Sequence, residues 1–183
     1  NVERQRDGSL AFNNIDARGS GLNMQGRMRL ARDNRILEVD LQRLAIEGRS
    51  DSRLTAIRAA DGGMDVTVRG ALFDAAPFMD TRSEDAEGGG TAANAAPEPP
   101  LRASIIVDRL KLRGGATLAN ANVSVITARG ALARLIADGR TPNNGAFALA
   151  LNPEDAPGRL RFRSDDGGFA VAADSAGRIH LGW

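Results

Sequence analysis

The chain has 183 residues, no cysteine, one histidine and a formal net charge of +1, with 24 basic against 23 acidic residues. This length is enough for one domain, or two small ones, with a real core. The composition excludes disulfides, zinc–thiolate sites, iron–sulfur clusters and any site that needs two imidazoles. Balanced charge and 4% aromatic residues argue against a nucleic-acid surface but leave room for a local arginine patch.

No apolar run approaches the ~20 residues of a membrane-spanning helix, and no signal peptide is present. The chain begins at Asn1 rather than Met, so we expect a fragment or a processed product from which an anchor has been removed. Every basic residue except Lys111 is arginine, which together with abundant Ala and Gly indicates a GC-rich bacterial genome rather than a function.

Alternation of apolar and polar residues dominates the chain and predicts β-strands with one apolar and one polar face. The alternating runs are residues 26–31, 35–42, 64–69, 103–110 and 160–163. Turn signals separate them, at Asp7-Gly8, Asp33-Asn34, Asp61-Gly62-Gly63, Arg113-Gly114-Gly115, Asn143-Asn144-Gly145 and Asp166-Gly167-Gly168. Such breaks are typical of antiparallel hairpins, so we predict an all-β fold of about ten strands. The expected form is an antiparallel meander that makes a curved sheet with an open groove.

Helical signals are few, and we expect at most one or two short helices. Residues 73–79 predict a single turn capped by Asp74, with Pro77 in its first turn. Residues 130–139 carry Leu132, Leu135 and Ile136 at helical spacing, but the same residues also fit a strand.

Residues 80–100 lack large apolar side chains and are rich in Gly, Pro and acids, which predicts a flexible loop. This loop divides the chain into a first β block at 1–79 and a second at 101–183, which we expect to continue the same sheet. The pattern R-x-x-D-G-G-Φ-x-V occurs at 58–66 and again at 163–171. It is either a true repeat or a coincidence of two generic turns.

The sequence predicts no enzyme and no metal or cofactor. His180 is the only imidazole and alternates with apolar residues, as in an exposed strand. The acidic pairs Asp165-Asp166 and Glu154-Asp155 fit turns better than paired catalytic acids or a calcium loop. A cleft that gathers Asp165, Asp166 and His180 would be needed to revive catalysis as a hypothesis.

The apolar strand faces are the remaining candidate site. They fit either the filled core of two packed sheets or a trough open to a lipid chain, and alternation does not separate the two. The candidate groove residues are Met28, Leu30, Val39, Leu41, Val66, Val68, Ile105, Val107, Leu160 and Phe162.

Two groups of β phrases carry a family resemblance. The first block contains Gly26–Leu30, Ile36–Leu44, Asp61-Gly62-Gly63 and Val68–Pro77; the second contains Val107–Leu112, Thr117–Val123 and Leu160–Gly168. These phrases resemble the AsmA-like repeat proteins of Gram-negative bacteria, and most of all their YhdP/TamB-type branch. In that branch, the phrase around Phe73-Asp74 closes a β segment, and Ala is usual in place of Gly167.

The resemblance implies a slice, from the C-terminal region, of a long β groove that crosses the periplasm from an inner-membrane anchor. Such proteins are similar to bridge-like lipid transfer proteins and are thought to carry phospholipid to the outer membrane. The implied partners are phospholipid acyl chains, adjacent β segments of the same protein and the inner membrane, with no catalytic residues. The alternative is a structural or interaction module of a bacterial envelope or surface protein, such as a β-solenoid or sandwich that binds by strand addition.

Two interpretations fit the roles of four arginines. Arg27, Arg29, Arg161 and Arg163 alternate with apolar residues, so their side chains are expected on the opposite, outer face, where they favour solubility. At the rim of a groove they would instead meet lipid phosphates.

Overall fold

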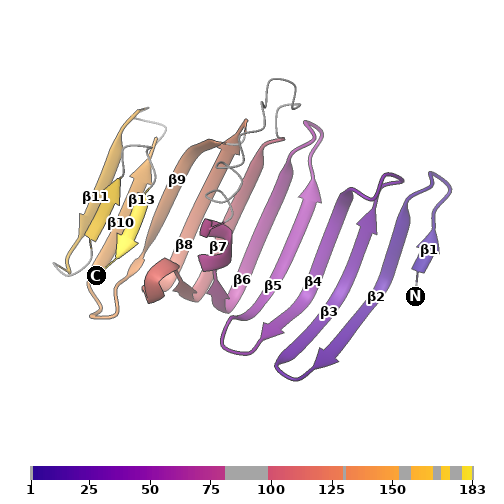
Figure 1. Cartoon of the computed structure of the whole chain (residues 1–183), viewed down its shortest axis with the longest axis horizontal. Helices are drawn as coiled ribbons and strands as arrows, with labels where there is room; N and C mark the ends of the chain where they lie inside the picture. The colour runs from indigo at the N-terminus through magenta and orange to yellow at the C-terminus, as the bar shows by residue number, and fades with distance from the viewer. Residues whose placement is uncertain are drawn as a thin grey trace.

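The computed structural model describes residues 2–80, 99–129, 131–152, 158–166, 170–173 and 179–182. Eleven strands form one open sheet in which every strand lies beside its neighbour in sequence (Figure 1). These strands are β1 (Val2–Arg4), β2 (Leu10–Gly19), β3 (Leu22–Leu30), β4 (Ile36–Ile46), β5 (Ser50–Arg58), β6 (Met64–Asp74), β7 (Leu101–Lys111), β8 (Thr117–Ala128), β9 (Ala131–Arg140), β10 (Ala146–Leu151) and β11 (Leu160–Ser164). Strands β12 (Ala170–Ala173) and β13 (Ile179–Gly182) form a separate antiparallel pair.

The predicted all-β curved sheet is confirmed, with one correction to its antiparallel meander. Strands β6 and β7 run parallel, whereas the other neighbours in the sheet are antiparallel. A parallel pair needs a crossover of a dozen or more residues, and the chain between Asp74 and Leu101 supplies that length. The strands on both sides of this crossover therefore belong to one sheet. Residues 81–98 lie outside the described part of the chain.

Turn chemistry follows the sequence closely. Gly8, Asn34, Gly62, Gly114 and Asn144 all adopt positive φ at the predicted turns. Positive φ is open to Gly and tolerated by Asn, which is why these residues end the alternating runs. The sixth predicted turn falls partly on residues 167–169, outside the described residues.

The short helix and the ambiguous segment are both resolved. Helix α1 (Ala76–Asp80) follows β6, and the Asp74 carboxylate accepts a hydrogen bond from the Ala76 backbone N–H at 3.1 Å, as the predicted cap requires. Residues 131–140 form strand β9 rather than a helix. Pairing with β8 and β10 on both sides overrides the helical spacing of the leucines.

The two copies of the repeated pattern connect their strands differently. The first contains the turn between β5 and β6, which are neighbours in the main sheet. The second runs from β11 to β12, which lie in different sheets. The pattern therefore does not mark two equivalent hairpins.

Register places apolar side chains in continuous rows on one face, called here the apolar face. One row crosses ten strands as Ile15, Gly26, Leu41, Leu54, Val68, Ile105, Val123, Ala137, Leu149 and Phe162. The next row is Phe12, Met28, Val39, Ala56, Val66, Ala103, Val125, Leu135, Leu151 and Leu160. Because strand side chains alternate, the opposite polar face carries the intervening Arg, Asp, Thr and Ser residues.

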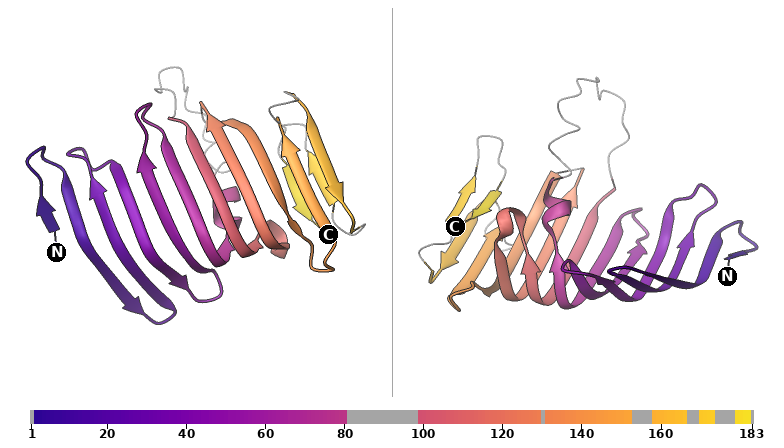
Figure 2. Two further views of the ribbon diagram at one scale, coloured as in Figure 1. Left: turned by 180° about the vertical axis from the view of Figure 1, so that it is seen from behind. Right: turned by 60° about the horizontal axis from the view of Figure 1, so that its bottom comes forward.

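A line of register shifts crosses the middle of the sheet. Shifts occur between Phe12 and Ile15, Gln25 and Gly26, Leu41 and Leu44, Asp51 and Ser52, and Ala119 and Asn122. Extra residues of this kind bend a strand and increase its twist. The sheet is accordingly curved, and its two ends rise toward the side that carries α1 (Figure 2).

Two glycines on this line allow neighbouring backbones to approach closely. A Cβ at Gly26 would collide with the backbone oxygen of Asp40, and a Cβ at Gly70 with that of Asp51. No other residue type fits these positions without moving the partner strand.

Candidate functional site

All of the candidate groove residues lie on the apolar face. Eight of them occupy the two rows given above, and Leu30 and Val107 lie on adjoining rows of the same face, paired with Leu10 and Gly70. Val68, Val107 and Leu41 are buried, with 2%, 3% and 8% of their surface exposed. Met28, Leu30, Val39, Val66 and Ile105 are half-buried. Leu160 and Phe162, on strand β11, are 44% and 41% exposed.

The apolar face divides into two parts. A buried cluster occupies β6–β10, with Leu110, Leu118, Phe147 and Leu149 each at most 2% exposed. Phe78 of α1 covers one end of it, because its ring stacks on Phe73 at 5.8 Å between centroids. The 3₁₀ turn η1 (Arg113–Gly115) and the β12–β13 pair lie on the same side of the sheet as α1, with β13 next to η1 (Figures 1 and 2).

The part of this face over β2–β4 is covered less completely. Its large apolar side chains stand outside the buried cluster and, apart from Leu41, which is buried, most of them are half-buried. The half-buried ones include Phe12, Ile15, Met24, Met28, Leu30, Val39 and Leu44. Each leaves part of its surface accessible, so this area is the open end of the apolar face.

The sequence prediction missed the centre of the buried cluster. Phe147 and Leu149 on β10 are 2% and 1% exposed, and Leu118 on β8 is 1% exposed. In β10 large and small apolar residues alternate, because alanines separate the large side chains. Polarity does not alternate along this strand. A search for apolar–polar alternation does not detect such a strand.

The polar face carries the four arginines for which the sequence allowed two roles, one on the outer face and one at the rim of a groove. Arg27 lies 3.3 Å from Glu38 and 3.4 Å from Asp40 across the β3–β4 pair. Arg29 lies opposite Glu38, and Arg161 and Arg163 project from β11 on this same face. None of them borders the open end of the apolar face, so their position fits the outer-face reading.

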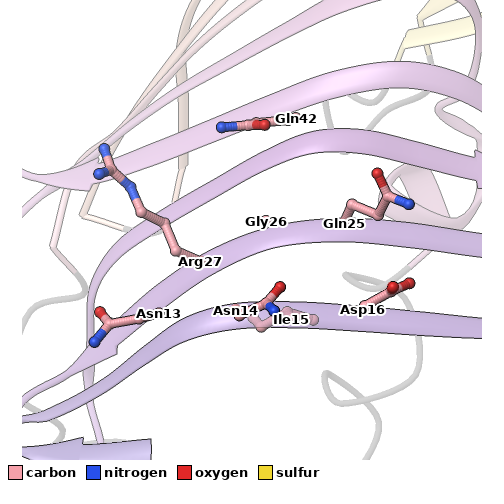
Figure 3. A pocket seen from close by; sticks show the side chains of 8 residues that line it. All are labelled: Asn13, Asn14, Ile15, Asp16, Gln25, Gly26, Arg27 and Gln42. Atoms are coloured by element: carbon pink, nitrogen blue, oxygen red, sulfur yellow. The ribbon is translucent and has the colours of Figure 1, made fainter. Parts of the chain in front are cut away.

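Two hollows lie on the polar face along the line of register shifts. The first has a volume of about 300 Å³ and is lined by Asn13, Asn14, Ile15, Asp16, Gln25, Gly26, Arg27 and Gln42 (Figure 3). The second, of about 290 Å³, is lined by Gln42, Arg43, Asp51, Ser52, Arg53, Arg69, Gly70 and Ala71. They share Gln42 in their linings and so lie next to each other. Sequence alone did not indicate either hollow, because bulges depend on pairing.

An ion-pair network ties the start of β7 to the β5–β6 turn. The Arg102 guanidinium donates to the carboxylates of Asp61 at 2.8 Å and Asp65 at 2.5 Å. Arg102, with a further hydrogen bond from the Gly63 N–H, holds the pKa of Asp61 at about 2. Because these groups are exposed, the ion pairs are better explained as contacts that hold the end of the crossover against the β5–β6 turn than as a site for acid–base chemistry.

The acidic residues singled out in the sequence have ordinary turn partners where they are described. Asn143 donates to Asp166 at 2.8 Å, and Arg163 lies 3.6 Å from Asp165. Residues 154–155 and the side chain of His180 lie outside the described part. In the described ranges, no three acidic or histidine side chains gather closely enough to hold a metal ion.

Within those same ranges, no helix is long and apolar enough to cross a membrane. Comparisons with protein-family models, with characterised proteins and with solved structures gave no match.

Proposed function

We propose that this chain is a segment of a periplasmic AsmA-like protein that binds phospholipid acyl chains on its apolar face. In this role it would serve lipid transport between the inner and outer membranes and the integrity of the envelope. The observation that supports it is the open end of the apolar face, where a curved sheet keeps large apolar side chains half-buried and no described helix or strand lies over them. The family resemblance of the sequence points to the same role.

Apolar burial alone is sufficient for such binding. Each CH₂ of an acyl chain that leaves water contributes about 0.8 kcal/mol, and no specific contact is required. Met28, Val39 and Phe12 share one row, so an alkyl chain could lie across β2–β4 along it. The headgroup would remain in water, and binding would tolerate different headgroups.

The buried cluster over β6–β10 favours a second candidate, a structural or interaction module. Phe147, Leu118 and Leu149 have nearly complete burial, which is typical of a filled interior. If the open end is only the thin margin of this core, the chain binds no lipid and serves as a rigid β segment.

Native mass spectrometry with lipid extraction, on protein purified from bacterial cells, tests the proposal. The wild type should carry phospholipid, and the double variant Met28→Gln/Val39→Thr should lose it while keeping its β-sheet circular dichroism. Both positions are half-buried, so polar substitution there is tolerated better than at Leu41, which is buried.

The matched control is Ile57→Thr on the polar face of β5, where the isoleucine is 55% exposed. It removes the same kind of apolar surface from the other side of the sheet and should leave bound lipid unchanged. A wild type that carries no lipid and takes none up from added phospholipid would overturn the proposal and favour the structural module.

A further inference from the structure

The second hollow of the polar face carries an excess of positive charge. Arg43 on β4, Arg53 on β5 and Arg69 on β6 line it, against one carboxylate, that of Asp51. We name this hollow, about 290 Å³ in volume, the arginine hollow. The register shifts beside Gln42 and Ala71 open it by pushing the backbone out of the regular pleat.

Two of these arginines stand in an unfavourable arrangement. Arg53 and Arg69 are direct cross-strand partners. Facing side chains of such a pair have Cβ atoms about 5 Å apart, and like charges placed there destabilise a sheet. Arg43 lies on the β4 side of Arg53, so arginines from three adjacent strands line one hollow.

Internal ion pairs do not neutralise the group. Arg53 reaches Asp40 at 3.4 Å, but Asp40 is shared with Arg27. In the part of the chain that the structure describes, Arg43 and Arg69 form no ion pair. Other arginines of this face, such as Arg102, are paired with acids.

We infer that the arginine hollow binds a terminal phosphate group with two negative charges. Three guanidinium groups supply more donors than Asp51 and the shared Asp40 can accept, and forked N–H pairs match the three terminal oxygens of a phosphate monoester. A dianion would relieve the repulsion between Arg53 and Arg69. This inference does not depend on lipid binding, because the arginine hollow lies on the opposite face of the sheet.

The same chemistry has two sources, a soluble phosphate and the headgroup of a lipid such as phosphatidic acid. The first test titrates inorganic phosphate into the whole protein by calorimetry, with chloride at equal ionic strength as the reference. The second measures sedimentation with phosphatidylcholine vesicles that contain phosphatidic acid. Binding in the first assay indicates a soluble ligand, and binding in the second alone indicates a membrane headgroup.

The decisive variant is Arg43→Gln/Arg69→Gln. It should weaken phosphate binding roughly tenfold or more, since each charge-assisted hydrogen bond contributes that order of affinity. The matched control is Arg29→Gln/Arg109→Gln, which removes the same charge from exposed positions of the same face outside the hollow. Its affinity should stay within about twofold of wild type.

The double variant Arg43→Lys/Arg69→Lys keeps both positive charges but loses the forked N–H pairs of arginine. It should recover only part of the affinity for phosphate. Because the Gln variant removes a repulsive pair, its thermal stability should not fall, which separates lost binding from lost folding. Equal losses in the two Gln doubles would mean nonspecific charge attraction. That result, or no binding of either phosphate source by the wild type, would overturn the inference.

Discussion

Arg102, the second residue of strand β7, grips Asp61 in the β5–β6 turn with two hydrogen bonds, at 2.8 and 3.2 Å. The pair joins chain segments separated by the whole crossover. It stands where the only parallel pair of the main sheet begins, with Met64 opposite Leu101. Two parallel strands are not joined by a tight turn that could set their register. The Arg102–Asp61 ion pair lies at the first residues of this parallel pair, where it can hold the register instead.

The Arg102–Asp61 ion pair predicts that the chain loses stability in acid. Folding lowers the pKa of Asp61 from 3.8 to about 2, so its ionised form stabilises the folded chain above pH ~4. That contribution is lost as the pH falls through about 2. Asp61→Asn should therefore lower the urea midpoint at pH 7 and have little effect at pH 2. The control is Asp108→Asn, at an exposed aspartate of β7 with no ion pair in the described chain, which should change the midpoint at pH 7 less than Asp61→Asn does.

The line of register shifts makes a second prediction, about Gly70. Gly70→Ala should cost about 1–3 kcal/mol of unfolding free energy, because its Cβ would collide with the Asp51 backbone. Gly19→Ala, near a strand end, is the control, since a Cβ there meets nothing within 4 Å. Denaturation with urea measures both. Equal effects of the two substitutions would show that the close approach at Gly70 is not a constraint.

Much of this architecture was predictable from local sequence. Alternation assigned Met28, Val39 and Val68 to one face because side-chain direction has a period of two residues whatever the neighbouring strand is. The turns at Gly62 and Asn144 were predictable because positive φ restricts the residue type. Both properties are local.

Local sequence patterns do not predict which distant segments of the chain pair with each other. The parallel contact of β6 with β7 depends on a crossover, and the separate β12–β13 pair depends on where the chain turns back. Burial is equally non-local: Val68 and Val39 have the same alternation, yet one is fully buried and the other half-buried. Alternation reports which face a side chain occupies, but not what covers that face.

The division of the apolar face predicts unequal effects of one substitution. Leu149→Ala, on β10, should cost about 2–5 kcal/mol, because Leu149 is 1% exposed in the centre of the buried cluster. Leu160→Ala, on the neighbouring strand β11, should cost less than about 1 kcal/mol, because that side chain is 44% exposed. Urea denaturation compares the two. Similar costs would contradict the placement of the filled core over β6–β10.

The opposed arginines predict a stability that rises with salt. Arg69→Thr removes the like charge opposite Arg53 and introduces a residue that favours strands, so it should stabilise the chain by about 0.2–1 kcal/mol at low salt. The gain should shrink as salt screens the pair, since the Debye length falls from about 10 Å at 0.1 M to about 3 Å at 1 M. Arg29→Thr is the comparison, because Arg29 faces Glu38 rather than another arginine. It removes an attraction, so it should destabilise at low salt, and its effect should also shrink at high salt. Thermal unfolding across this salt range measures both, and a loss of stability in Arg69→Thr at low salt would show that the facing guanidinium groups do not repel.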